Sequence, residues 1–169
     1  MADVIFTTIH GSNLYGFAHA GSDHDTFTVT DSHRARARQT VDDAGNDRVV
    51  VGLDHFLDLV HGGSHQSVEA LFSPVKEWAD TPAADHYRPM LNAHRITGSE
   101  VFAKYERTIR AFAFGDYKRR RHAARLTTNL QQLRIDGTIR PRLSEDEARW
   151  CNLTADAYSG RDLERYLLP

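Results

Sequence analysis

The sequence has very little cysteine and no long apolar run. Cys151 is the single cysteine among 169 residues, which excludes an internal disulfide and a zinc site built on several cysteines. The lone cysteine fits a reducing compartment, so we expect a cytoplasmic protein. No apolar segment approaches the length of a membrane span, and the start, Met-Ala-Asp-Val, lacks the features of a secretory signal. We therefore expect no membrane partner.

A strong net charge of either sign is also absent, because the whole chain carries only −2. This balance hides an asymmetry. The stretch from 95 to 142 has 12 Lys and Arg against 4 Asp and Glu, a local charge of +8, which leaves −10 for the rest. The densest block is Lys118-Arg119-Arg120-Arg121, with Arg125 one turn further on. Such a block is commonly a solvated helix face, but beside a phosphate-handling site it would hold triphosphate or a nucleic-acid backbone.

Two Gly-Ser pairs near the N-terminus mark candidate phosphate-binding turns. An apolar segment over 4–9 runs directly into Gly11-Ser12, and Gly21-Ser22 follows ten residues later. A Gly-Ser turn offers backbone N–H groups and a hydroxyl to a phosphate. Ser12 could also simply cap a short helix. In this context we favour substrate binding by Gly11, Ser12 and Ser22.

A pair of aspartates stands directly after the second Gly-Ser. Side chains i and i+2 of a strand point to the same face, so a strand here would place Asp23 and Asp25 side by side. Hard divalent cations such as Mg²⁺ bind carboxylates and bridge to substrate phosphates. Asp47 opens another strand-like run, 49–51, and would supply a third carboxylate. These features predict a metal-dependent enzyme that handles a nucleoside triphosphate.

Apolar spacing and turn residues predict strands in the first half and helices in the second. We expect strands over 4–9, 23–30 and 47–52, short helices over 11–15 and 67–72, a helix from 53 to Gly62, and a loop over 31–46. The second half shows helical stripes over 102–112 and 126–133, a capping box at 144–147 and a last helix over 161–168. The fold class is therefore α+β, with a small mixed sheet. We expect a catalytic core over 1–94 and a basic helical region over 95–169 packed across the open face of the sheet.

Gly11-Ser12, Asp23-His24-Asp25 and a later strand acid resemble the nucleotidyltransferase pattern of the DNA polymerase beta superfamily. The stretches 47–57 and 67–74 are similar to the predicted nucleotidyltransferases linked to RNA repair. The basic helix with Lys118, His122 and Arg125 also resembles that group. The specific part of the resemblance runs from 9 to 74. His24 departs from the family pattern, where an apolar residue usually separates the paired acids.

The resemblance implies a role for each matching residue. Asp23, Asp25 and Asp47 would be the catalytic carboxylates that hold Mg²⁺, as a two-metal site, with Mn²⁺ as a possible substitute. Gly11 and Ser12 would bind the triphosphate. The third carboxylate is the least defined of the set, because the residue after Asp47 is Arg48 where an apolar residue is common. The alternatives for that position are Asp42, Asp43 and Asp54.

We expect transfer of an NMP from an NTP to a hydroxyl acceptor with release of pyrophosphate. An RNA end, with tRNA favoured, is the expected acceptor, because the resemblance and the +8 region agree. A protein-modifying nucleotidyltransferase and a non-catalytic nucleotide- or RNA-binding module are the alternatives. Lys118, Arg121 and Arg125 lie three and four residues apart, so they share one helix face, and we expect that face to line the cleft. Arg119 and Arg120 should point elsewhere.

Overall fold

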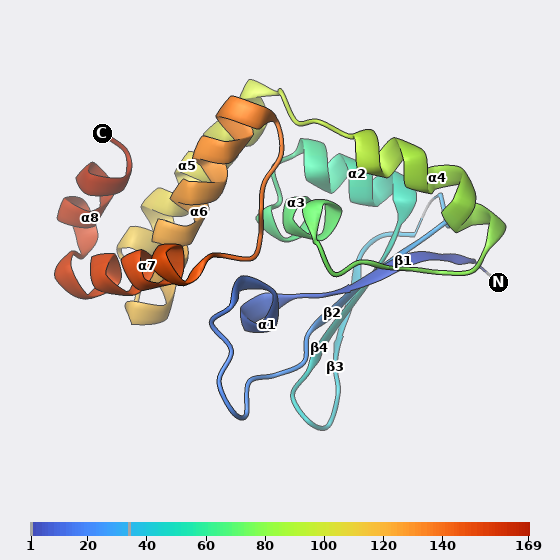
Figure 1. The fold of residues 1–169 in the computed structure, drawn as a ribbon, viewed down its shortest axis with the longest axis horizontal. Coiled ribbons are helices and arrows are strands. Elements are labelled where there is room, and N and C mark those ends of the chain that lie inside the picture. Colours follow the sequence, from blue (N-terminus) through green and yellow to red (C-terminus); the bar gives the residue numbers. More distant parts are fainter. Residues whose placement is uncertain (1, 34) are drawn as a thin grey trace.

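The structure is a computed structural model that describes residues 2–33 and 35–169 (Figure 1). Within these residues the chain forms five strands and eight helices and has the α+β fold class that the sequence predicts. The strands are β1 (Val4–Ile9), β2 (Thr26–Thr30), β3 (Arg38–Val41), β4 (Asp47–Gly52) and β5 (Glu77–Trp78). The helices are α1 (Gly11–Tyr15), α2 (Leu53–His61), α3 (His65–Phe72), α4 (Pro82–Ala93), α5 (Ser99–Ala113), α6 (Tyr117–Asp136), α7 (Glu145–Ala157) and α8 (Gly160–Leu167).

The five strands form one mixed sheet in the order β3-β4-β2-β1-β5. β2 and β4 run parallel, and the other neighbouring strands are antiparallel. Phe6, Phe27 and Val51 point from three neighbouring strands toward α2 and are buried. Phe56 of α2 meets the first two with ring centroids 5.8 and 5.9 Å apart. Apolar side chains that alternate along these strands therefore share one face of the sheet, and helices pack on that face (Figure 1).

Helix ends follow local sequence rules. Ser144 and Glu147 form the expected capping box at the start of α7. α6 begins after Asp116, whose side chain accepts a hydrogen bond from the Arg119 backbone N–H, and ends at Gly137 with a φ of 67°. These signals fix the long helix that carries the basic block.

The C-terminal helices lie differently from expectation. α5, α6, α7 and α8 form a bundle beside the end of the sheet instead of packing across its open face, and α2 with its neighbour α3 lies on the other face (Figure 1). The apolar length of α2, with Leu53, Phe56 and Val60 on one side, explains why it takes that face. The buried apolar side chains of both halves form one cluster that runs from Ile5 to Leu167.

Two strand boundaries differ from prediction. β2 begins at Thr26 rather than at residue 23, because the backbone before it bonds to side chains instead of a neighbouring strand. Asn13 Nδ2 donates to the Asp23 carbonyl at 2.6 Å, and the His24 N–H donates to Asn46 Oδ1 at 2.7 Å. The expected loop over 31–46 contains β3, which pairs with β4 through a turn at Asp42; residue 34 lies outside the described part of the chain.

The stretch 75–94, for which the sequence analysis assigns no element, forms β5 and α4. No helix in the described part of the chain is both long enough and apolar enough to cross a membrane.

Candidate functional site

One cavity of about 230 Å³ collects nearly all the predicted site residues. Asp23, Asp25 and Asp47 line it together with Gly11 and Ser12. The basic helix α6 contributes Lys118, Arg121 and Arg125 to the same wall. Six further residues complete the lining: His10, Tyr15, His65, Gln66, Phe112 and His122. Ser22, which the sequence predicts as a substrate ligand, lines an adjoining compartment instead.

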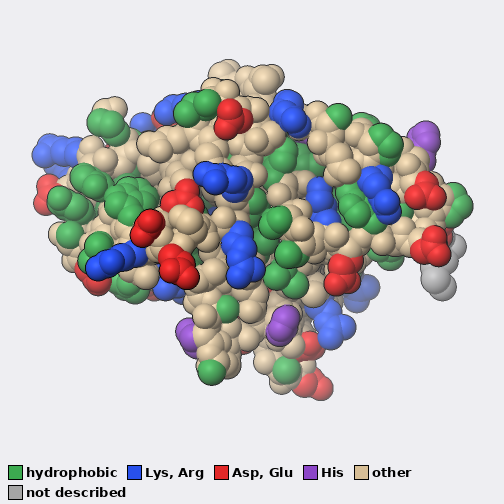
Figure 2. Space-filling model, viewed as in Figure 1, with side chains coloured by type: hydrophobic (Ala, Val, Ile, Leu, Met, Phe, Trp, Pro, Cys, Tyr) green, Lys and Arg blue, Asp and Glu red, His purple; other side chains and the backbone are tan. Residues whose placement is uncertain are grey.

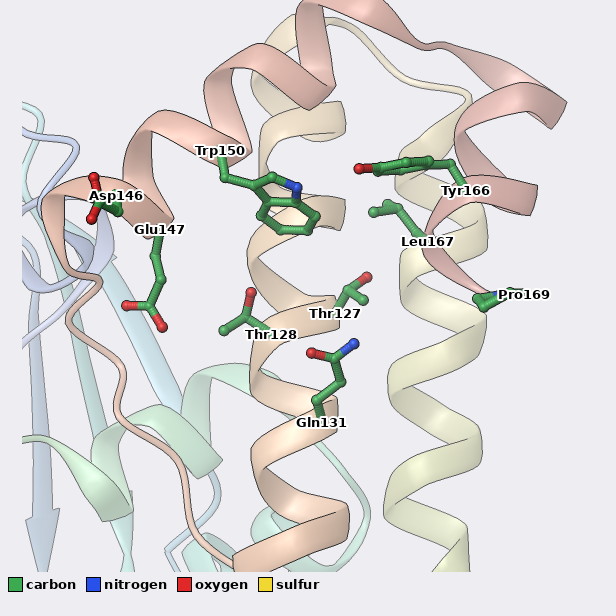
Figure 3. A pocket seen from close by; sticks show the side chains of 9 residues that line it. All are labelled: Thr127, Thr128, Gln131, Asp146, Glu147, Trp150, Tyr166, Leu167 and Pro169. Atoms are coloured by element: carbon green, nitrogen blue, oxygen red, sulfur yellow. The ribbon is translucent and has the colours of Figure 1, made fainter.

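A larger cavity of about 620 Å³ lies in the helical bundle between α6, α7 and α8 (Figure 3). Figure 3 shows Trp150 and Tyr166 on opposite walls, with Thr127 and Gln131 on the helix between them. The charged side chains in its wall are two acids, and one of them, Glu147, is engaged in the cap of α7. Because none of the predicted site residues lines it, we place the candidate site at the smaller, more polar cavity.

Gly11 makes a close approach between the first turn and Asp25 possible. Its φ is 66°, in the region that glycine adopts at no steric cost. A Cβ at this position would overlap Asp25 Oδ2. The His10 N–H donates to the Asp25 carbonyl at 2.9 Å and holds the two segments together. Only glycine lets the turn lie against the carboxylate.

Asp25 and Asp47 come together because β2 and β4 are parallel neighbours. Thr26 pairs with Arg48, so Asp25, directly before β2, and Asp47, the first residue of β4, reach the same edge of the sheet. The Asp47 backbone N–H donates to Asp25 Oδ1 at 3.0 Å. This register places Asp47 at the cavity, where the sequence predicts the third acid.

The three alternative acids lie elsewhere. Asp42 accepts hydrogen bonds within its hairpin turn and pairs with Arg48 at 3.0 Å. Asp54 pairs with His33 at 3.3 Å and lines a different cavity. Asp43 is exposed in the hairpin turn. None of the three lines the cavity that holds the acid pair.

The basic face of α6 is oriented as the helical spacing predicts. Lys118, Arg121 and Arg125 line the cavity, and Arg119 and Arg120 do not. The Arg120 guanidinium instead donates to the carbonyls of Ala155 and Gly115 at 3.0 and 3.2 Å. Figure 2 shows side chains of both charges interspersed on the visible face, so the +8 of this region forms no continuous basic surface there.

Arg125 has contacts that sequence reasoning missed. Its side chain is 1% exposed and pairs with Glu69 Oε1 at 2.5 Å. The guanidinium lies 3.7 Å from the centre of the Tyr15 ring, and the Tyr15 hydroxyl donates to Glu69 Oε2 at 2.6 Å. These contacts favour a structural role for Arg125 over the direct substrate binding that the sequence predicts. The available signal was Glu69 itself, an acid surrounded by the apolar residues of α3.

Both members of this buried pair are charged. Desolvation is the largest effect on the Glu69 carboxyl and acts to raise its pKa, but Arg125, His65, His10 and the Tyr15 hydrogen bond together outweigh it, so the pKa lies below its ordinary value. Desolvation is likewise the largest effect on Arg125 and acts to lower its pKa, but Glu69 together with Tyr15 and Tyr105 outweighs it, so the pKa is raised. A pair of this kind is stable only while both partners are present.

Three histidines also line the cavity and were not assigned to the site from the sequence. Burial lowers the pKa of His10, His65 and His122, and for His122, where the charge of Arg125 adds to burial, the pKa falls to about 3. His122 Nδ1 lies 3.4 Å from Arg125 Nε, which donates to it. The ring is therefore neutral, with its proton on Nε2. The histidines add no charge to the cavity at neutral pH.

The donor set of the cavity fits Mg²⁺, although its ligands do not converge by themselves. Among residues 2–33 and 35–169, no three His, Cys, Asp or Glu side chains are already grouped closely enough to hold a metal ion. Mg²⁺ commonly binds through one or two carboxylates, with waters and substrate phosphates completing its shell. The three carboxylates offer such oxygen ligands and form no ion pair within the described chain.

Comparison with known proteins adds no family to this description. A scan against known protein families and a search of curated proteins both give no match for this chain.

Proposed function

We propose that this protein is a Mg²⁺-dependent nucleotidyltransferase that transfers an NMP from an NTP to a hydroxyl acceptor and releases pyrophosphate. One observation carries the proposal: the cavity is lined by three acids and two bases that do not pair with one another. Within the described chain, neither Lys118 nor Arg121 forms an ion pair, and the same holds for Asp23, Asp25 and Asp47.

Unpaired charges of both signs around one cavity suit a ligand that carries both signs. A triphosphate with its divalent cation is such a ligand. The phosphates would meet Lys118, Arg121 and the Gly11-Ser12 turn, and the cation would meet the carboxylates. A binding module that held only RNA would have no use for three acids beside its bases.

The proposed reaction places each group in a role. Asp47 orients the acceptor hydroxyl and accepts its proton. The hydroxyl oxygen forms a bond to the α-phosphorus as the bond to the β-phosphate oxygen breaks, and pyrophosphate leaves with the bonding electrons. Lys118 and Arg121 hold the phosphate oxygens. The chemistry that Mg²⁺ supplies when bound is neutralisation of charge on the transferring phosphate. The favoured acceptor is an RNA end, with tRNA as the natural candidate.

Incubation with each α-labelled NTP, Mg²⁺ or Mn²⁺, and total tRNA tests the proposal. We expect label on RNA with the unmodified protein. Asp25→Asn should lower the rate by about a thousandfold, because the loss of a metal ligand removes several kcal/mol of transition-state stabilisation. Asp54→Asn, which makes the same charge change outside the cavity, should transfer normally.

Each other result has its own meaning. Label on protein would establish the protein-modifying alternative. Nucleotide binding without any transfer would establish the binding module. Normal transfer by Asp25→Asn would show that the metal assignment is wrong.

A further inference from the structure

A second compartment of about 240 Å³ adjoins the catalytic cavity. Ser12, Asp23, Lys118 and Arg121 line both spaces and form the boundary between them. The other lining residues of the second compartment come from the loop between α1 and β2: Phe17, His19, Gly21 and Ser22. The compartment therefore belongs to the same site, although the proposed reaction assigns it no role.

The sizes of the two spaces indicate a site in two parts. Each is smaller than the roughly 300 Å³ at which small-molecule sites usually begin. Neither can hold a donor nucleotide and the end of an acceptor together. In an in-line transfer, the attacking and leaving oxygens stand on opposite sides of the phosphorus. Two compartments that meet at Asp23 match that requirement, one for each side.

The groups of the second compartment are mostly hydrogen-bond donors. Lys118 and Arg121 supply positive charge, and the Ser12 and Ser22 hydroxyls can donate as well. Arg121 Nε is buried and has no hydrogen-bond partner in the described chain. Arg121 also forms no ion pair within the described chain, so its charge is free to meet a ligand oxygen.

The compartment does not suit a nucleobase. The Arg121 guanidinium lies 4.1 Å from the centre of the Phe17 ring and covers that face, and His122 meets the same ring edge-on at 6.4 Å. Phe17 therefore holds Arg121 in place instead of stacking on a base. A fixed guanidinium beside a lysine is suited to phosphate oxygens.

We propose that this second compartment binds the terminal phosphodiester of an RNA acceptor. The inference rests on the proposed function. The terminal phosphodiester would contact Lys118 and Arg121, and the end hydroxyl would then extend past Asp23, at the boundary, toward Asp47, which accepts its proton. The triphosphate would occupy the side with Gly11, Asp25 and Asp47. Arg121 contacts donor and acceptor in turn and so couples the two halves of the site.

His19→Glu tests the inference, because His19 is exposed and lines only the second compartment. Binding of a short RNA is measured by fluorescence anisotropy without nucleotide, and binding of Mg²⁺ with a non-hydrolysable NTP analogue by calorimetry. We expect the RNA dissociation constant to rise about tenfold and that of the analogue to stay within about twofold. His86→Glu, an exposed and charge-matched change on α4, should alter neither.

A second RNA, whose last linkage is an uncharged methylphosphonate, identifies the contacted group. With the unmodified protein it should bind about tenfold more weakly than ordinary RNA. His19→Glu should bind the two RNAs equally weakly. The new carboxylate repels the terminal phosphate of ordinary RNA, whereas the methylphosphonate linkage carries no charge to be repelled.

The opposite results separate the two proposals. RNA affinity that His19→Glu leaves unchanged, or no RNA binding by the unmodified protein, overturns the second compartment as an acceptor site. A loss of analogue binding with unchanged RNA binding shows that the compartment holds triphosphate. If RNA binding responds as expected but no NMP is transferred, the acceptor site stands and the proposed reaction fails.

Discussion

Arg121 and Arg125 lie one turn apart on α6 and line the same cavity, yet their surroundings are opposite. Arg125 is buried and fully engaged by Glu69, His122 and Tyr15. Arg121 stacks on Phe17, makes no ion pair within the described chain and keeps an unpartnered Nε. The first arginine holds the fold around the site, and the second is open to a ligand. The difference is between a buried, completed charge pair and an arginine of the same cavity whose charge has no ion-pair partner in the described chain.

The largest effect should come from breaking the completed pair. Glu69→Gln leaves Arg125 buried without a counter-charge and should lower the free energy of unfolding by about 3–5 kcal/mol. Glu106→Gln is the control for an exposed pair, because its two partners, Arg134 at 2.6 Å and Arg110 at 3.3 Å, are both partly exposed. That change should cost at most about 1 kcal/mol. Urea titrations at neutral pH measure both. Equal losses in the two variants would contradict the structural role of Glu69.

The same pair also predicts that the free energy of unfolding decreases at acidic pH. The folded-state pKa of Glu69 lies below its ordinary value of 4.5. The stability from the pair is therefore present above that ordinary value and is lost as the pH falls through the folded value. Glu69→Gln should remove this part of the acid sensitivity, which urea titrations over the same pH range would reveal.

An intermediate effect should come from removing the positive charges of Lys118 and Arg121, which have no ion-pair partner in the described chain. Each charge-assisted contact to phosphate contributes about 1.5–3 kcal/mol, so loss of both contacts in Lys118→Ala with Arg121→Ala should weaken RNA binding at least about a hundredfold. Its salt dependence should flatten by a slope of about 1.4, since two fewer counterions are released. The unfolding midpoint should change little.

Arg107→Ala with Arg119→Ala removes two charges that line neither part of the site and is the matched control. Anisotropy at several salt concentrations compares the two double variants. An equal slope in both would show that the basic face of α6 is an ordinary solvated surface.

The smallest effect at neutral pH concerns His122, which stays neutral beside the arginine pair, and this effect grows as the pH falls. Its folded-state pKa of about 3 lies below the ordinary 6.5, so below pH 6.5 the unfolded chain binds a proton that the folded chain does not. Stability should fall by up to about 1.4 kcal/mol per pH unit from this group as the pH drops from 6.5 toward 3. His122→Gln should lose that slope, whereas exposed His86→Gln should keep it. Urea titrations at pH 7, 6 and 5 provide the comparison.

The parts of the site that could be predicted are those set by local spacing. The place of Gly11-Ser12 after an apolar strand and the basic face of α6 follow from short-range patterns. Asp23 and Asp25 also line the cavity, although the strand expected to align them begins only at Thr26. Asp47 begins the next core strand and lines the cavity as well. Each of these residues reaches the cavity or its boundary.

Long-range contacts were outside the reach of such patterns. Glu69 and Arg125 are 56 residues apart, and neither spacing nor periodicity links them. The placement of the bundle beside the sheet also depends on long-range contacts, because α2 rather than the later helices packs on β2 and β4, and a helical period does not say which helix meets the sheet. The start of β2 was wrong because the side chains of Asn13 and Asn46, far apart in sequence, take up the backbone groups that a strand would use.

The pairing of Glu69 with Arg125 also affects how the protein folds while it is being synthesised. At roughly 5–20 residues per second, the ribosome needs about 3–11 s to add the 56 residues that separate the two. Throughout that interval the N-terminal half has a carboxylate destined for the interior and no counter-charge to bury it with. Early closure of that half is therefore penalised, and the carboxylate waits in water for α6. The same helix carries the bases that line the candidate cavity, so the buried pair and that cavity are both completed only after α6 has been synthesised.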